Sequence, residues 1–197
     1  MSAPSDKIEI ACVGHTELLR AARKLTEGDL RRPSLLPGWD RARVLAHLAH
    51  KSHSHVSVFT GAAAGEQRSQ YPSGQAAAEG ETAAWSQRPA DELCDLVAEG
   101  FASLERAWAA MPDQAWSRTA TSSAGERAMT GFVDRHLRDL FVHHVDLDIG
   151  YVADDWPALF VSTELAKRIR DLSGRAAPHT LLAWLLGRAG APQLGPW

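Results

Sequence analysis

The 197-residue sequence predicts an all-α protein, a four-helix bundle followed by short additional helices at the C-terminal end. Apolar residues recur at three- and four-residue steps through most of the chain, which is the spacing of one helix face. Proline and glycine interrupt this pattern at intervals, and no stretch reads convincingly as a run of strands. Helices joined by loops of modest length pack most naturally as an antiparallel bundle.

Composition narrows the classes of function. Hydrophobic residues make up 45% and charged residues 23% of the chain, which are globular values. The net charge of −3 gives no indication of a nucleic-acid partner or of a polybasic membrane surface. The first residues lack the order of a signal peptide, and no apolar run is long enough to cross a bilayer. Two distant cysteines suit a reducing compartment, so we expect a cytoplasmic protein.

The first two expected helices cover residues 6–31 and 41–60. Pro33 stops the first, because proline lacks an amide donor and disfavours helix before it. A Pro-Gly turn follows, and Asp40 is a suitable N-cap for the second helix. His47 falls among the apolar residues of that helix, so its imidazole is expected to point inward. For His50, His53 and His55 the simplest interpretation is a solvated polar face, although His55 also falls among the residues that suggest the inward side.

The middle of the chain alternates between weak and strong helix signals. Residues 61–80 are rich in Gly, Ala, Ser and Gln and predict a loop with room for one short helix. Pro89 opens a helix with a clean apolar stripe, which ends at Pro112. Residues 113–128 predict either a loop or a small hairpin.

The last long helix is expected to start at Thr130 as its cap and to end at Gly150. Shorter helices are expected over 158–172 and from Pro178 onward. We therefore expect a metal-binding four-helix bundle over 1–153 and a short helical extension over 154–197, packed on the bundle.

The last long helix carries an unusual number of ionisable groups for a buried segment. Asp139 and His143 lie four residues apart, so their side chains share one helix face. Such a pair can hold one metal ion, or it can form a hydrogen bond without any metal.

With His47 the two side chains make a set of two imidazoles and one carboxylate, which leaves a fourth metal position open. Catalytic zinc sites have this composition, and Fe(II) accepts it as well. The alternative is a buried Asp–His hydrogen bond with a separate core histidine.

Several segments resemble the mycothiol-dependent maleylpyruvate isomerase family, which belongs to the DinB-like superfamily of metal-binding bundles. They are LLPGW at 35–39, VLAHLA at 44–49, Trp116-Ser117, RDLFVHHVDL at 138–147 and GRAG at 187–190. The resemblance covers most of the chain. It is more specific for the fold and the metal site than for the substrate.

The resemblance implies zinc ligands at His47, Asp139 and His143, although another divalent metal is possible. It also implies Arg188 as an active-site cation that can pair with a substrate carboxylate. A helix-end charge facing water is the simpler interpretation of Arg188. Asp139 stands where the family usually has Glu, and Lys51 stands where it commonly has Asn. Lys51 can bind an anionic substrate or extend to solvent.

The function that this resemblance implies is a zinc-dependent enzyme with mycothiol as nucleophile and maleylpyruvate-type cis–trans isomerisation as its reaction. The alternatives are a mycothiol S-transferase acting on an electrophile, and a non-catalytic metal-binding bundle. His50 and Asp146 are candidates to orient the ligating imidazoles. The expected partners are a small-molecule substrate and a thiol, without nucleic acid or membrane, for a monomer or homodimer. The C-terminal region is expected to be shorter than in relatives, so the residues that form this wall of the thiol or substrate site are not identified from sequence.

Overall fold

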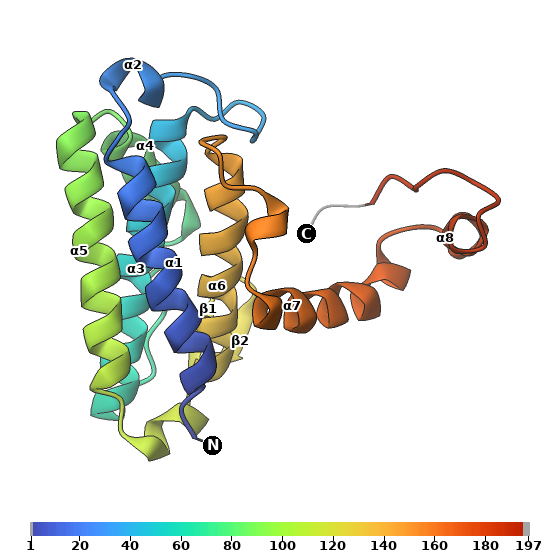
Figure 1. Ribbon diagram of the computed structural model, residues 1–197. Coiled ribbons are helices and arrows are strands. Elements are labelled where there is room, and N and C mark those ends of the chain that lie inside the picture. Colours follow the sequence, from blue (N-terminus) through green and yellow to red (C-terminus); the bar gives the residue numbers. More distant parts are fainter. Residues whose placement is uncertain (1, 195–197) are drawn as a thin grey trace. The chain divides into compact units, whose positions relative to one another are not determined.

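Four long helices build the first of two compact units in the computed structural model, which describes residues 2–194 (Figure 1). This unit covers residues 1–156. Its long helices are α1 (Ser5–Ala22), α3 (Arg41–Ala64), α5 (Ala90–Ala109) and α6 (Met129–Asp146). Shorter helices α2 (Glu27–Leu30) and α4 (Gln75–Trp85) lie between them, with single 3-10 turns η1 (Asp113–Ser117) and η2 (Ala153–Asp155).

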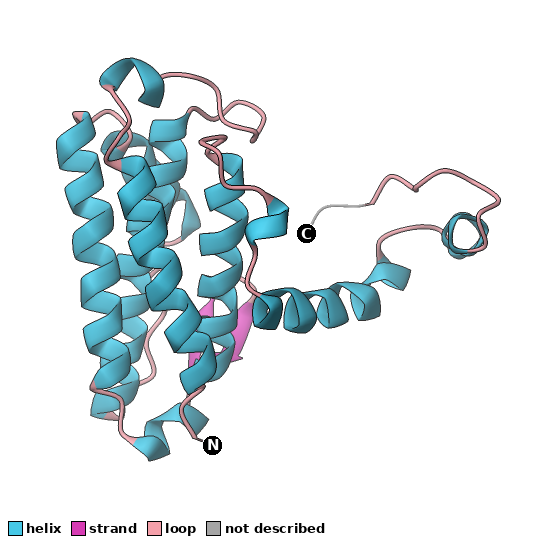
Figure 2. Cartoon of the chain, in the orientation of Figure 1, coloured by secondary structure: helices cyan, strands magenta, loops and turns pink. Residues whose placement is uncertain are grey.

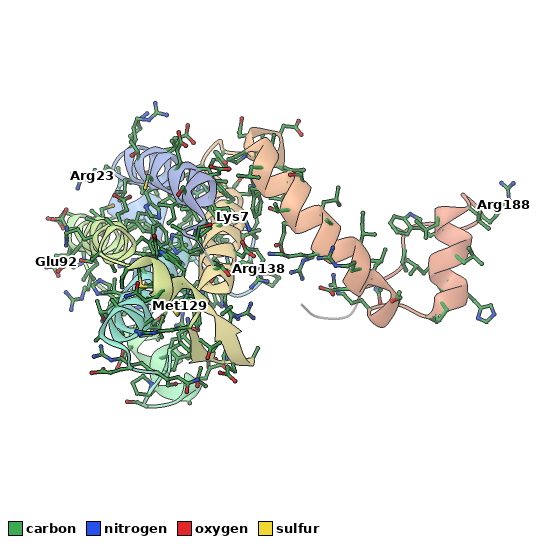
Figure 3. The ribbon with its side chains drawn as sticks, turned by 90° about the horizontal axis from the view of Figure 1, so that it is seen from below. Lys7, Arg23, Glu92, Met129, Arg138 and Arg188 are labelled. Atoms are coloured by element: carbon green, nitrogen blue, oxygen red, sulfur yellow. The ribbon has the colours of Figure 1, made fainter. Side chains whose placement is uncertain are left out.

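The long helices form a bundle in which α1 and α3 each pack against both α5 and α6. Side chains such as Met129 fill the space between the helices, whereas Arg23 and Glu92 point outward (Figure 3). The apolar stripe predicted for the third long helix is buried along α5, from Leu93 to Trp108. The predicted all-α bundle is therefore confirmed, and Figure 2 shows how little of the chain is strand.

Local sequence signals account for the ends of α3, the longest helix. The Asp40 side chain accepts a hydrogen bond of 2.8 Å from the Arg43 amide, as expected of an N-cap. At the other end Gly65 has φ +87°, a left-handed conformation that glycine adopts without strain. The helix is thus four residues longer than the expected 41–60, because Gly61 continues it and the left-handed Gly65 ends it.

Three expectations about the ends of helices were wrong, one of them being that the last long helix reaches Gly150, because α6 ends at Asp146. The first helix does not continue to residue 31, because α1 ends at Ala22 and Thr26 starts the separate helix α2. Thr26 and Asp29 form a capping box, which satisfies the free amides at a new helix start. Thr130 does not cap the last long helix, which already begins at Met129 with Ala128 before it.

The open alternatives of the middle segments are resolved. The weak segment 61–80 contains the first part of the short helix α4, which continues to Trp85. Strands β1 (Thr119–Ser122) and β2 (Gly125–Ala128) pair as an antiparallel hairpin, with Thr119 opposite Ala128. The hairpin therefore lies directly before α6, the helix that carries Asp139 and His143.

The second unit, residues 157–197, holds helices α7 (Ala158–Asp171) and α8 (Pro178–Leu185), with the 3-10 turn η3 (Leu172–Gly174) between them. Pro178 occupies the first turn of α8, where its missing amide proton is not needed. Whether this unit packs on the bundle stays a prediction. Within residues 2–194 no helix has the length and apolar character to cross a bilayer.

Candidate metal site between two helices

A column of ionisable side chains lies along the contact between α3 and α6. The side chains recur at three- and four-residue steps, which place them on one face of each helix. From α3 come His47, Lys51 and His55, and from α6 come His143, Asp139 and His136. The two sets face each other pairwise: ring centroids of His47 and His143 are 5.0 Å apart, Lys51 Nζ is 3.5 Å from Asp139 Oδ2, and the rings of His55 and His136 are 5.9 Å apart.

Arg41 fixes the spacing of these two helices at one end of the column. Its side chain is buried, and its Nε donates to the Leu147 carbonyl oxygen over 2.7 Å. Its Nη2 donates to the Asp148 carbonyl oxygen over the same distance. The amide of Leu35, in the LLPGW segment, also donates to the Asp146 carbonyl oxygen at 2.8 Å. The start of α3 and the end of α6 are therefore held together by hydrogen bonds to backbone carbonyls.

The two imidazoles at this end meet edge to face. The planes of the His47 and His143 rings are inclined by 86°, and the Trp39 ring packs against His47 with centroids 5.5 Å apart. His143 Nδ1 donates to Asp146 Oδ2 over 2.8 Å, which leaves its Nε2 as the atom with a lone pair for a ligand. Burial first, and then the neighbouring His143, lower the pKa of His47 to about 3, so its ring is neutral at pH 7.

Asp139 and Lys51 form a buried ion pair one turn further along. Only 8% of Asp139 and 5% of Lys51 is exposed. Arg138 adds a second, longer contact of 3.8 Å to Asp139 Oδ1. Asp139 Oδ2 nevertheless has no hydrogen-bond partner. Burial by itself raises the pKa of Asp139, but the positive charges around it, Lys51 first, bring the pKa below its ordinary value.

This donor set suits a divalent metal in kind. It offers two imidazoles, of which that of His47 is neutral, and one ionised carboxylate with an oxygen atom that no hydrogen bond satisfies. Within residues 2–194, however, no three His, Cys, Asp or Glu side chains are already grouped as a complete metal site. The ion pairs of Asp139 are with Lys51 and Arg138, and the alternative of an Asp139–His143 hydrogen bond is not observed.

Comparison with known proteins gives this arrangement a context. Residues 13–148 match the family model described as "Mycothiol maleylpyruvate isomerase N-terminal domain". The chain belongs to this family. The matched residues include α3 and α6, which carry the candidate metal ligands. They end at Asp148, whose carbonyl oxygen accepts a hydrogen bond from Arg41. No match was found among curated protein sequences.

Two crystal structures have a similar fold, both described as the mycothiol-dependent maleylpyruvate isomerase. The first gives a TM-score of 0.78 at 24% identity. The second, a variant with one histidine replaced by alanine, gives 0.76 at 25% identity. Each comparison covers 83% of this chain and 68% of the other chain.

A second polar cluster in the bundle of this family member was missed by reasoning from sequence. His15 on α1 contacts two partners: its Nδ1 donates to Glu105 Oε1 at 2.6 Å, and its Nε2 lies 2.7 Å from His136 Nε2. The His15 ring also stacks on Phe101 with centroids 3.9 Å apart. His15 and His136 are 121 residues apart in sequence, so no local pattern links them. The one available indication is the three-residue spacing of His136 and Asp139, which places both on the same face of a helix.

The three histidines expected on a solvated face do not behave alike. His55 is fully buried, and neither of its ring nitrogens has a hydrogen-bond partner, so that interpretation was wrong for His55. Its position on the α3 face toward α6 explains the burial, since Phe132 packs edge to face on its ring at 5.5 Å. His50 contacts Glu81 at 3.0 Å rather than a metal-site residue, and it lines a cavity together with His53.

Arg188 follows α8 in the second unit, directly after Gly187 with φ +66°. Its side chain is exposed and extends from the end of α8 (Figure 3). A role of Arg188 toward a substrate stays a prediction. The structure thus brings His47, His143, Lys51 and Asp139 together within the bundle.

Proposed function

We propose that this protein is a zinc-dependent enzyme that uses mycothiol as a nucleophile for maleylpyruvate-type cis–trans isomerisation. One observation carries the proposal: the family match spans α3 and α6, on which His47 faces His143, while Asp139 lies one helical turn from His143 and is paired with Lys51. The relatives with the same fold are described as mycothiol-dependent maleylpyruvate isomerases. A cytoplasmic location belongs to the same proposal, because the two cysteines are unpaired and a low-molecular-weight thiol is kept reduced there.

In this proposal His47, Asp139 and His143 hold the metal ion. Two nitrogens and one carboxylate oxygen leave a further position for sulfur, as in catalytic rather than structural zinc sites. Asp146 would orient the imidazole of His143 through the 2.8 Å hydrogen bond to Nδ1. Zinc is the favoured ion, although other divalent metals accept the same ligands.

A bound zinc ion would promote the ionisation of a coordinated thiol near neutral pH. Isomerisation requires a sulfur nucleophile to add to a cis double bond, rotation about the resulting single bond, and loss of the same sulfur. Arg188 would bind a substrate carboxylate through its planar guanidinium. Lys51, which is paired with Asp139 at 3.5 Å, would bind an anionic group of the substrate once the metal ion replaces it as the partner of that carboxylate.

The test is metal content. Purified protein is expected to contain about one zinc ion per chain by elemental analysis, and His47→Ala or His143→Ala is expected to lose most of it. His179→Ala, at an exposed position of α8, is the matched control, and circular dichroism checks that each variant is folded. Retention of zinc by both site variants would contradict the proposal.

An activity assay then separates the reaction classes. Metal-loaded protein with mycothiol is expected to isomerise maleylpyruvate, and Asp139→Asn is expected to reduce the rate. Conjugation of mycothiol to a generic electrophile without isomerisation would indicate an S-transferase instead. Metal binding with neither reaction would indicate a non-catalytic bundle.

A further inference from the structure

Three arginines form a row that runs from the hairpin to the middle of α6. Arg127 lies near the end of β2, and Arg135 and Arg138 follow on α6 at a three-residue step. All three side chains are partly buried. We infer that this arginine row is a binding site for a small tetrahedral oxyanion of the phosphate type. The inference goes beyond the proposed function, because such binding needs neither metal nor thiol.

A glycine on α6 lets the arginine of the hairpin join those of the helix. A Cβ atom added at Gly131 would lie 3.0 Å from Arg127 Cγ and 3.7 Å from its Nη1, so the Arg127 side chain lies across this glycine. Gly131 is one helical turn before Arg135, which is itself one turn before Arg138. The pKa of Arg127 is lowered, first by burial and then by the charges of Arg135 and Arg138, as expected of neighbouring cations.

Two members of the row have no acceptor for their donors. Among residues 2–194, Arg127 and Arg135 have no ion pair and no side-chain hydrogen bond, and the Nε atom of each is buried without a partner. Other arginines of the bundle do find acceptors: Arg41 donates to the Leu147 carbonyl oxygen and Arg118 to that of Ala62. Packing of the arginine stems on the helix explains their partial burial. It does not explain two charged donors that are kept from water without an acceptor, which is costly.

The two carboxylates of this part of α6 are already paired with lysines. Asp134 accepts from Lys7 Nζ, and Asp139 Oδ2 lies 3.5 Å from Lys51 Nζ. Arg138 approaches only Asp139 Oδ1, at 3.8 Å, which is too long for a hydrogen bond. The row therefore carries more positive charge than the neighbouring acidic side chains balance.

The arrangement of the donors selects the class of anion. A guanidinium group offers a planar fork of N–H donors, and a planar carboxylate matches one such fork. The row presents forks from a strand and from two turns of a helix. A tetrahedral oxyanion has oxygen atoms in several directions, so it can accept from all of them at once. Phosphate groups also carry a charge of about −1.5 to −2 near pH 7, which suits three cations without carboxylate partners of their own.

The experiment is isothermal titration calorimetry on the full chain in EDTA, with inorganic phosphate as the probe and succinate as a dianion with planar carboxylates. Sodium chloride keeps the ionic strength constant, since salt screens exposed charges. Phosphate is expected to bind more tightly than succinate. Arg135→Gln is expected to weaken phosphate binding about tenfold or more, whereas Arg20→Gln, at an exposed position of α1, leaves it unchanged.

Gly131→Ala is a second variant that keeps all three charges but places a methyl group where the Arg127 side chain lies. It is expected to weaken phosphate binding, although less than Arg135→Gln does. Thermal unfolding without phosphate checks each protein, and Arg135→Gln is expected to be at least as stable as the unaltered chain, because it removes like-charge repulsion. Equal affinity for succinate would overturn the class of anion. Absence of phosphate binding at millimolar concentration, or unchanged binding by Arg135→Gln, would overturn the site.

Discussion

Two polar clusters meet at α6, one facing α3 and the other facing α1 and α5, and they differ in how their members are satisfied. In the cluster around His15, both ring nitrogens of that residue have partners, Glu105 at 2.6 Å and His136 at 2.7 Å. In the cluster around Asp139, the carboxylate oxygen Oδ2 lies 3.5 Å from Lys51 Nζ and has no hydrogen bond. A cluster whose polar atoms satisfy one another maintains the fold, whereas one with an unsatisfied acceptor is suited to a ligand.

Removing Lys51 is expected to have the largest effect and to depend on zinc. In metal-free protein, Lys51→Met leaves Asp139 buried without its main counter-charge, at a cost of about 3–5 kcal/mol in the free energy of unfolding. Zinc is expected to reduce this cost, because the ion replaces the ammonium as the partner of the carboxylate. Urea denaturation with EDTA and with zinc measures both values, with exposed Lys24→Met as the control. An equal cost under both conditions would contradict a metal ion at Asp139.

Removing His15 is expected to cost somewhat less and to be indifferent to zinc. His15→Ala deletes a ring stacked on Phe101 and leaves His136 without its partner. We expect a loss of about 3 kcal/mol in the free energy of unfolding, from the cavity and the broken hydrogen bonds. The same urea series applies, with His179→Ala as the exposed control. A zinc-dependent loss would mean that the two clusters are not separate in function.

Acid is expected to weaken both clusters gradually. Burial lowers the pKa of His55 from its ordinary 6.5 to about 3, and the pKa of His136 also lies well below 6.5. Below about pH 6.5 the unfolded chain binds protons that the folded chain does not, so the free energy of unfolding falls as the pH decreases toward 3. Each such histidine contributes up to about 1.4 kcal/mol per pH unit. Urea titrations in EDTA across this range measure the slope, and a flat profile would show that these histidines are not neutral when folded.

His55 sharpens the comparison with the smallest expected change. It is fully buried between the two clusters, and neither ring nitrogen has a partner. Replacing an unsatisfied polar ring by an apolar side chain of similar size is nearly neutral or stabilising. His55→Leu is therefore expected to change the free energy of unfolding by less than about 1 kcal/mol, measured by urea denaturation. A large loss would show that His55 has a partner, such as a bound water molecule, and belongs to the satisfied cluster.

The sequence predicted the bundle well where one signal dominated. The stripe from Leu93 to Trp108 has one apolar face and no competing interpretation, and α5 follows it. The break after Ala22 was missed because the apolar pattern continues through Leu25, while the capping box of Thr26 and Asp29 is stronger locally. The hairpin stayed an open alternative because strands of only four residues show too little alternation.

For the candidate site, helix periodicity predicted which face of its helix each residue occupies. It did not predict which residues of α3 and α6 lie opposite one another. It put His47 on one inward face and Asp139 with His143 on another, because spacing within one helix is readable from sequence. The register between α3 and α6 depends on packing and on Arg41, so the pairing of Lys51 with Asp139 was not predictable. For the same reason the contact between His15 and His136 had no local signature.

The hydrogen bonds of Arg41 have a consequence for how this family can diverge. They join the two ligand-bearing helices through carbonyls at Leu147 and Asp148, ahead of everything C-terminal to them. The spacing of the imidazoles is thereby set before the chain leaves the bundle. Segments after Asp148 can therefore be lengthened, shortened or exchanged during evolution without changing the distance between His47 and His143. Substrate specificity can then change while the candidate metal site keeps its geometry.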